Sequence, residues 1–207
     1  MVSTLFASEL TQRDLPFLTE LWHRSEVAQY SDEFPRVRGW TRDDSADDAW
    51  KAYQKRRAKL GDLYLQLIIR LADGEPIGEP IGEPVGESVG EPIGESFSIA
   101  LREGSTFGTW KKPPGALVLI GDIKLSPEYW GKGLGTDAMR IVVRRRFKET
   151  GCDLYCVPPH KENGRARRLY EKVGFELCTG MESYRDHLVM ELTRDRYMKL
   201  FEGGASA

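Results

Sequence analysis

The sequence lacks the features that mark membrane, disulfide-linked and zinc-binding proteins. None of its apolar runs is long enough to span a bilayer, and residues 1–14 lack the basic stretch followed by an apolar one that begins a secretory leader. Its three cysteines, Cys152, Cys156 and Cys178, are odd in number and lack the paired spacing of zinc ligands. We therefore expect a cytoplasmic protein with buried free thiols, no disulfide framework and no metal.

A strong excess of charge of one sign is also missing, with 30 Lys and Arg residues against 32 Asp and Glu residues. Residues 1–100 carry 11 basic and 18 acidic side chains, whereas residues 101–207 carry 19 and 14. A basic second half suits an anionic ligand and an acidic first half a cationic one, although such charge is more often only solvated surface. The basic and aromatic stripe typical of nucleic-acid binding is absent from the sequence.

The composition that remains is that of one globular domain, with 40% hydrophobic and 30% charged residues in 207. Apolar residues recur at helical spacing in residues 10–30, where Thr11 and Asp14 form a capping pair, and predict an amphipathic helix. A second helix is expected from about Thr41. The acids in its early turns complement the positive end of the helix.

A tetrapeptide repeat, GEPI and its variants, fills residues 74–97. Proline removes a backbone donor in nearly every unit, so most units cannot lie inside a central strand. Because strands are predicted on either side, at residues 63–71 and 97–101, we interpret the repeat as a duplicated insertion in a strand–strand hairpin loop. A docking arm is the alternative, which the lack of aromatic anchors disfavours.

The second half alternates strands and helices, which predicts an α/β domain, or α+β in some schemes, with a mixed sheet. The longest strand is expected at residues 116–125, with Asp122 and Lys124 on one face and Ile123 and Leu125 on the other. The other elements expected are helices at 134–150 and 165–173 and strands at 154–157 and 187–192.

Three glycines, Gly131, Gly133 and Gly135, stand within five residues at the start of the helix predicted at residues 134–150. Amides exposed by glycines at a helix N-terminus form an anion site, which indicates a phosphate. The P-loop pattern fails because Gly133, rather than Ser or Thr, follows Lys132. The spacing G-x-G-x-G also misses the dinucleotide-binding fingerprint.

A third geometry fits the two segments VLIGDIKLSPEYWGKGLGTDAM, from Val118, and ENGRARRLYEKVGFE, up to Glu176. Together they resemble the GCN5-related N-acetyltransferases (GNAT), particularly the RimJ/RimL-like branch and the aminoglycoside 6'-N-acetyltransferases. The resemblance implies one acetyltransferase domain over residues 1–207. Its sheet would be mixed and mostly antiparallel, flanked by helices on both faces, with two splayed central parallel strands. It also implies acetyl-coenzyme A (acetyl-CoA) as donor, an amine acceptor and no metal, and it allows a homodimer.

In this family the glycine loop wraps the pyrophosphate of acetyl-CoA, and the pantetheine arm pairs with the strand before it. The residues that the resemblance assigns to the coenzyme are Ile123, Leu125, Trp130, Gly131, Lys132, Gly133, Leu134, Gly135, Thr136, Asn163 and Arg167. Trp130 departs from the family's Gln or Arg. Asn163 would serve equally as a plain helix cap, and a solvated helix face explains basic residues such as Arg165, Arg167 and Arg168 equally well.

Two residues are candidates for the chemistry. Tyr170 matches the family tyrosine that protonates the departing thiolate, and its alternative role is helix packing. Asp122, a lone acid in an apolar strand, is the candidate base that takes a proton from the attacking amine, with an ion pair to Lys124 as an equally weighted alternative. Glu128 and Glu182 are weaker candidates.

The fold does not choose among protein N-termini, lysine side chains, polyamines and aminoglycosides as acceptors. Trp22, Asp32, Glu33 and Trp40 are expected to line a pocket for a cationic acceptor, although aromatic residues there suit a core equally. The amine would attack the thioester directly. A different class stays open, namely a non-catalytic module that senses acyl-CoA or presents the repeat to a partner.

Overall fold

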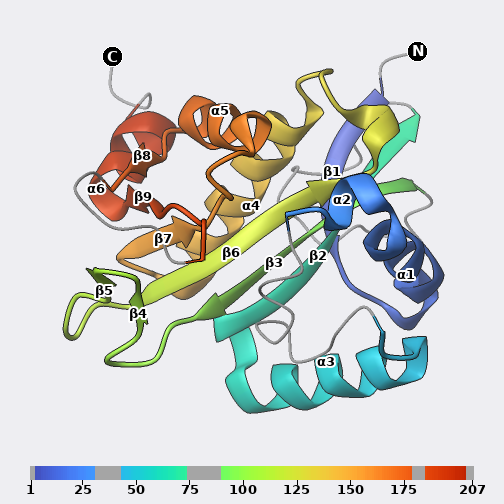
Figure 1. The fold of residues 1–207 in the computed structure, drawn as a ribbon, viewed down its shortest axis with the longest axis horizontal. Helices are drawn as coiled ribbons and strands as arrows, with labels where there is room; N and C mark the ends of the chain where they lie inside the picture. The colour runs from blue at the N-terminus through green and yellow to red at the C-terminus, as the bar shows by residue number, and fades with distance from the viewer. Residues whose placement is uncertain (1–2, 31–42, 74–89, 179–184, 204–207) are drawn as a thin grey trace.

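The computed structural model describes residues 3–30, 43–73, 90–178 and 185–203 (Figure 1). Its centre is a seven-stranded sheet in the order β1-β2-β3-β6-β7-β9-β8. The strands are β1 (Ser3–Glu9), β2 (Tyr64–Asp73), β3 (Glu91–Ala100), β6 (Val118–Leu125), β7 (Leu154–Val157), β8 (Glu176–Leu177) and β9 (Met190–Thr193), with a separate hairpin of β4 (Thr106–Phe107) and β5 (Trp110–Lys111). Within these ranges β6 and β7 run parallel, and the other paired strands run antiparallel.

Six α-helices and a few single turns surround this sheet in the described ranges. The helices are α1 (Leu15–His23), α2 (Ser25–Ala28), α3 (Ala46–Leu60), α4 (Leu134–Thr150), α5 (Gly164–Val173) and α6 (Arg194–Tyr197). The turns are η1 (Gln12–Asp14), η2 (Gly61–Leu63), η3 (Pro127–Tyr129) and η4 (Met198–Glu202). Among the described helices, none has the length and hydropathy needed to cross a membrane.

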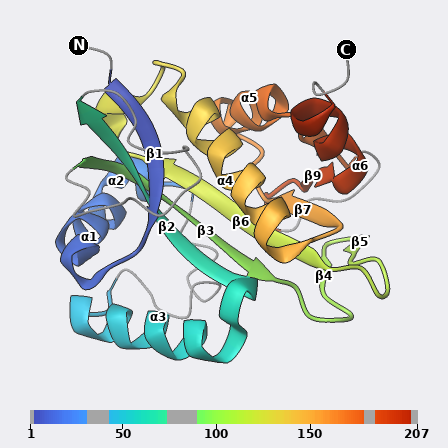
Figure 2. The ribbon, with the colours of Figure 1, turned by 180° about the vertical axis from the view of Figure 1, so that it is seen from behind.

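Different helices cover the two faces of the sheet, as Figures 1 and 2 show from opposite sides. Successive side chains of a strand point to opposite faces. Leu65 and Leu67 of β2 accordingly join the core under α4 and α5, whereas Tyr64 and Ile68 join the core under α1 and α3. The predicted architecture, a mixed and mostly antiparallel sheet with helices on both faces, is confirmed.

The two parallel strands separate before β6 ends. β6 pairs with β3 from Leu119 to Leu125, but its pairing with β7 stops at Ile120. β7 itself ends at Val157, paired with β9 on its other edge. The last residues of β6 therefore have a strand on one side and a gap on the other, which is the predicted splay.

Helix α4 begins and ends at the predicted residues because its determinants are local. Gly133 at its N-cap has φ 84° and Gly151 at its C-cap has φ 65°, left-handed values that favour glycine. Between them Met139, Val143 and Phe147 recur four residues apart and are buried in the core. The packing of α4 on the sheet confirms that this face is buried, but the spacing in the sequence is enough to predict it.

Three other elements differ from their predicted bounds. The helix expected over residues 10–30 is interrupted at Arg24, whose extended backbone (φ −68°, ψ 121°) separates α1 from α2. The next helix starts at Ala46, with Ser45 as its N-cap, while Thr41 lies outside the described residues. The last strand starts at Met190, because His187 forms only an isolated bridge with His160.

The end of the repeat lies in a central strand, contrary to the interpretation of residues 74–97 as a loop. β3 starts at Glu91 and pairs with β2 and β6. Pro92 is accommodated because the β2–β3 register shifts between Ile69 and Arg70, opposite the proline. The remaining repeat residues described here, Gly90 excepted, belong to this strand, while residues 74–89 lie outside the described ranges.

Candidate active site

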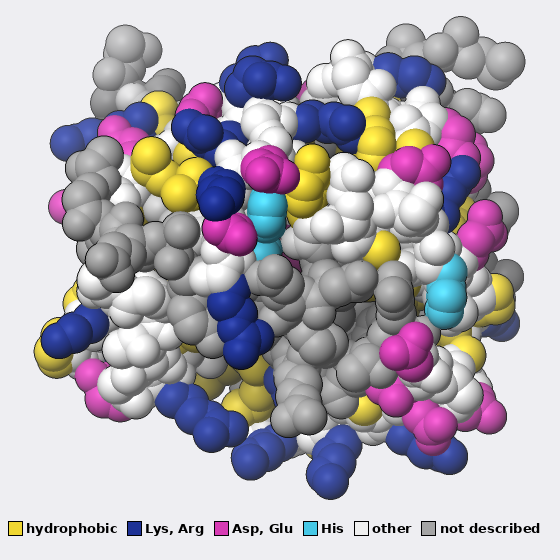
Figure 3. All heavy atoms as spheres, viewed as in Figure 1, with side chains coloured by type: hydrophobic (Ala, Val, Ile, Leu, Met, Phe, Trp, Pro, Cys, Tyr) yellow, Lys and Arg dark blue, Asp and Glu magenta, His cyan; other side chains and the backbone are white. Residues whose placement is uncertain are grey.

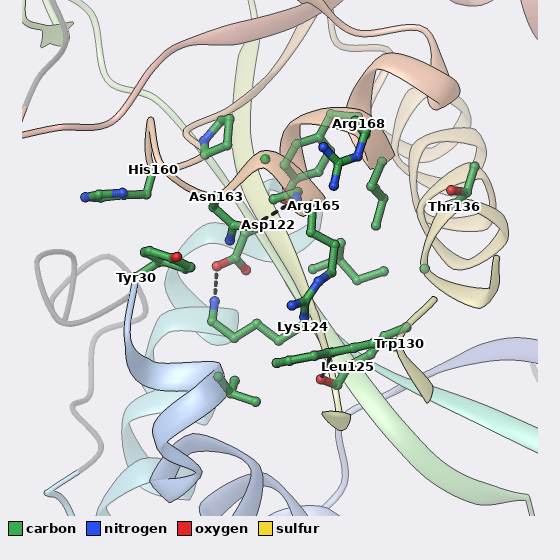
Figure 4. A pocket seen from close by; sticks show the side chains of 18 of the residues that line it. Tyr30, Asp122, Lys124, Leu125, Trp130, Thr136, His160, Asn163, Arg165 and Arg168 are labelled. Atoms are coloured by element: carbon green, nitrogen blue, oxygen red, sulfur yellow. Dashed lines mark hydrogen bonds and ion pairs between the residues drawn. The ribbon is translucent and has the colours of Figure 1, made fainter. Parts of the chain in front are cut away.

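A cavity of about 680 Å³ opens where β6 and β7 separate. Figure 4 shows its walls, which come from the end of β6, the glycine-rich turn before α4, the first turns of α5 and residues 26–30. This volume falls within the range of small-molecule sites in proteins. Its position at the gap leaves one backbone edge of β6 facing the cavity.

The glycine loop, residues 131–135, presents a row of amides at the N-terminus of α4. Gly131 and Gly133 have φ values of 76° and 84°, which turn successive amides in one direction. Among the described residues, none of the five loop amides has a hydrogen-bond acceptor. The flanking amides are bonded, from Trp130 to the carbonyl of Pro127 (3.1 Å) and from Thr136 to that of Gly133 (2.9 Å). These five amides are therefore available to an anion. The amides of Trp130 and Thr136, which the resemblance also assigned to the coenzyme, are not.

The third glycine serves packing. A Cβ added at Gly135 would lie 2.7 Å from Cδ1 of Leu169, so glycine here allows α4 and α5 to approach closely. Two other loop residues do not line the cavity. Lys132 is exposed with its ammonium 5.5 Å from the ring centre of Tyr129, and Leu134 packs against the core.

Trp130 and two arginines form the wall beside the loop. The indole Nε1 of Trp130 donates to the carbonyl of Leu125 (2.8 Å), and the Arg165 guanidinium stacks 3.8 Å from the ring centre. Arg165 and Arg168 line the cavity, whereas Arg167 does not (Figure 4). The spacing i, i+3 places the first two on one side of α5, a signal that could have separated them from Arg167.

Figure 3 shows Lys and Arg side chains gathered near the edge where Figure 1 places α5.

Asn163, predicted either to hold the coenzyme or to cap a helix, caps α5. Its Oδ1 accepts from the amide of Ala166 at 3.0 Å, and the residue also lines the cavity.

Tyr170 lies in the wall of the cavity across the gap from β6 and is only 3% exposed. Burial raises the pKa of its hydroxyl well above the ordinary value, the charge of Asp122 adds to this shift, and a backbone hydrogen bond from Ile123 opposes it. The hydroxyl is therefore protonated at neutral and moderately alkaline pH. Tyr170 can donate a hydrogen bond into the gap, and it also packs edge-on against Phe175, 5.6 Å between ring centres.

Asp122 forms an ion pair with Lys124, which is the alternative weighed for this residue from the sequence. Both line the cavity, and Figure 4 shows the carboxylate and the ammonium facing each other inside it. Glu128 lies elsewhere. Its carboxylate accepts from both Nη atoms of Arg24 at 2.5 and 2.7 Å, and this pairing lowers its pKa. Glu182 lies outside the described residues.

A buried acid opposite the cavity-lining Lys124 in the β3–β6 register was missed from the sequence because it belongs to the repeat. Glu95 is fully buried, and its carboxylate accepts from Trp22 Nε1 and from Gln66 Nε2, both at 2.7 Å. Trp22, expected in the acceptor pocket or the core, is in the core and 7% exposed. The other expected lining residues, Asp32, Glu33 and Trp40, lie outside the described ranges.

Charges of both signs line the cavity. Arg165 and Arg168 of α5 lie beside the glycine loop, Asp122 of β6 is paired with Lys124, and Glu26 comes from α2. Within the residues described, no group of three or more His, Cys, Asp and Glu side chains could hold a metal ion. The cavity thus offers an anion site and a cation site joined by the open edge of β6.

Comparison with known proteins agrees with this geometry. The family described as acetyltransferase (GNAT) domain matches residues 5–176. Aminoglycoside acetyltransferase AAC(6')-Ib, solved with ribostamycin and coenzyme A, is similar with a TM-score of 0.66 and 25% identity, covering 96% of this chain and 98% of that one. Spermidine N-acetyltransferase from Vibrio cholerae, solved with CoA and spermine, has a TM-score of 0.65 and 18% identity, covering 94% and 98%.

The family match spans most of the chain, and its fold places a glycine loop beside two splayed parallel strands, as the sequence resemblance implied. The chain belongs to the GNAT family of acetyltransferases.

Proposed function

We propose that the chain transfers the acetyl group of acetyl-CoA to a primary amine of a cationic small molecule, by direct attack of the amine on the thioester. The observation that carries this proposal is the glycine loop, whose five amides lack an acceptor among the described residues. Converging N–H groups and the positive end of the α4 dipole suit a diphosphate. Arg165 and Arg168 add positive charge at the same end of the cavity.

The coenzyme's pantetheine arm would lie along the open edge of β6. Ile123 lies on this edge with its backbone bonded to Tyr170, and the carbonyl of Leu125 accepts from Trp130, so both contacts border the path of the arm. Through this contact Trp130 has a structural role, which differs from the role of the family's Gln or Arg. The tryptophan holds the strand end and supports Arg165, instead of contacting the coenzyme by a hydrogen bond of its own.

Two side chains would manage the protons. An alkyl ammonium must lose a proton before it can attack, and Asp122 would take that proton, directly or through water. Burial makes Tyr170 a weaker acid than a thiol, because its pKa is raised well above its ordinary value. Tyr170 therefore stabilises the departing sulfur mainly by donating a hydrogen bond while the carbon–sulfur bond breaks.

Carboxylates from β6 and α2 support a cationic acceptor. Asp122 and Glu26 line the cavity, and the buried Glu95 lies opposite Lys124 in the β3–β6 register. The similarity to proteins solved with an aminoglycoside and with spermine agrees with this choice. A protein N-terminus would bring one ammonium group, so it would gain less from this charge than a polyamine does.

An acceptor screen tests the proposal. The full chain is incubated with acetyl-CoA and, separately, ribostamycin, kanamycin, spermidine, spermine, a lysine peptide and a peptide with a free N-terminus, while release of free thiol is recorded. We expect turnover with members of the first four and little with the peptides. Turnover confined to the peptides would reject the acceptor class. Coenzyme binding by calorimetry without turnover of any amine would favour the non-catalytic module instead.

A further inference from the structure

The acceptor side of the cavity already holds an alkyl ammonium, that of the chain's own Lys124. Its Nζ is paired with the carboxylate of Asp122 and lies 4.4 Å from the ring centre of Trp22. The Lys124 side chain is 9% exposed, and the residue lines the cavity. A carboxylate together with an aromatic face is a common way for proteins to hold a primary ammonium group. Lys124 is thus held as an acceptor amine would be held.

The surroundings of Lys124 are fixed by buried contacts. Glu95 lies directly opposite Lys124 in the β3–β6 register and is fully buried. Its carboxylate holds the indole of Trp22 and the amide of Gln66. The aromatic face under the ammonium is therefore locked in one orientation, which limits where Nζ can lie.

Lys124 also stands beside the expected path of the thioester. Its sequence neighbours Ile123 and Leu125 form the open edge of β6, and its carboxylate partner Asp122 influences the pKa of Tyr170 across the gap. The candidate base, the amine and the tyrosine therefore line the same cavity, with the base and the amine in contact. A nucleophile held in place in this way reacts as if it were present at very high concentration.

We propose that Lys124 is a self-acetylation site, modified by the chain's own catalytic centre when no external amine is bound. The inference rests on the proposed function. Asp122 takes a proton from the ammonium, and the neutral Nζ attacks the thioester carbonyl carbon. A carbon–nitrogen bond forms and the carbon–sulfur bond breaks, so the acetyl group becomes an amide. The second amine proton leaves to solvent, and the released sulfur takes up the proton from Asp122 as free coenzyme A.

The difference in burial between Lys161 and Lys124 provides an internal control for uncatalysed acetylation. Acetyl-CoA in bulk solution reacts with accessible lysines, and the side chain of Lys161 is 49% exposed against 9% for Lys124. Uncatalysed labelling must therefore favour Lys161. Preferential labelling of Lys124 in the folded chain requires a bound and oriented thioester.

The experiment incubates the full chain with isotope-labelled acetyl-CoA near neutral pH, without added amine, and measures each lysine by peptide mass spectrometry. We expect Lys124 to be labelled at least about tenfold faster than Lys161, as proximity predicts. This preference should vanish in concentrated urea. Thiol release without amine should approach one equivalent per chain and be lost in Lys124→Arg, which keeps the positive charge but provides no comparable nucleophile.

Two measurements distinguish failure of the self-acetylation inference from failure of the proposed function. If the amine screen gives turnover but Lys124 is labelled no faster than Lys161, the inference is overturned while the proposed function stands. If calorimetry detects no coenzyme A binding and no amine is acetylated, the proposed function fails and the inference fails with it. Equal labelling of Lys124 in the folded and urea-treated chains would also overturn it.

Discussion

Replacing Gly133 by alanine tests the anion site through the backbone alone. A Cβ at this position meets no heavy atom within 4 Å, so the substitution causes no clash. Its φ of 84° is instead a conformation that costs an L-residue about 1–2 kcal/mol. The strain is relieved by rotating the adjoining peptides, which turns the loop amides away from their common direction. Gly115 is a matched control, because it has φ 73° with no atom within 4 Å and does not line the cavity.

Both variants should lose about 1–2 kcal/mol of unfolding free energy in urea denaturation, because both carry the same backbone strain. Only Gly133→Ala should bind coenzyme A more weakly. Losing one hydrogen bond to a charged phosphate costs about 1.5–3 kcal/mol, so its dissociation constant by calorimetry should rise roughly 10–100-fold. Equal affinity of Gly133→Ala and Gly115→Ala for coenzyme A would refute the assignment of the loop amides to the diphosphate.

Two buried tyrosines and the close contact between Gly135 and Leu169 can be tested by substitution and by pH. Tyr170→Phe should lower kcat about 10–100-fold, the value of one hydrogen bond to a developing charge, with the KM for acetyl-CoA unchanged; an unaltered kcat in steady-state kinetics would remove this role. Burial raises the pKa of both Tyr155 and Tyr170, so their contribution to stability is complete below about pH 10 and is lost as pH rises further, because the unfolded chain releases these protons first. Urea denaturation measured across this range should show the fall, and a flat profile would contradict it. Gly135→Ala should cost about 1–3 kcal/mol through overpacking against Leu169, and the double variant with Leu169→Ala should show a favourable coupling energy, whereas additive losses would speak against the contact.

The elements that were predictable from the sequence are those with local determinants. Helix α4 has a glycine at each end and a regular apolar face between them, so both its bounds could be read without the sheet. The start of β3 could not. Pro92 argues against a central strand, and only the shifted register opposite it in β2 shows how the proline is tolerated. The pairing of β3 with β2 and β6 sets this boundary, and the local sequence does not predict it.

The same distinction holds within the candidate site. The anion site follows from glycines at the start of a helix, and the strand period of two placed Asp122 and Lys124 on one face, where the structure pairs them. The role of Glu95 was hidden because its unit looks like every other unit of the repeat. Its burial depends on Trp22 and Gln66, which come from different elements and meet it only in the folded chain.

The repeat and the site are linked through the register of β3 against β6. Gly94 lies so close to the carbonyl of Lys124 and the side chain of Leu125 that any side chain there would clash, which fixes the pairing of the two strands. A slip of one residue would turn Asp122 and Lys124 to the opposite face and destroy the acceptor side. The repeat period of four is a multiple of the strand period of two, but the register shift between Ile69 and Arg70 breaks this parity inside β3. Glu91 pairs with Leu71 and Glu95 pairs with Ile68, so these two glutamates of successive units face opposite sides of the sheet. The site therefore depends on the last described unit alone, in which Gly94 fixes the register against β6 and Glu95 lies opposite Lys124.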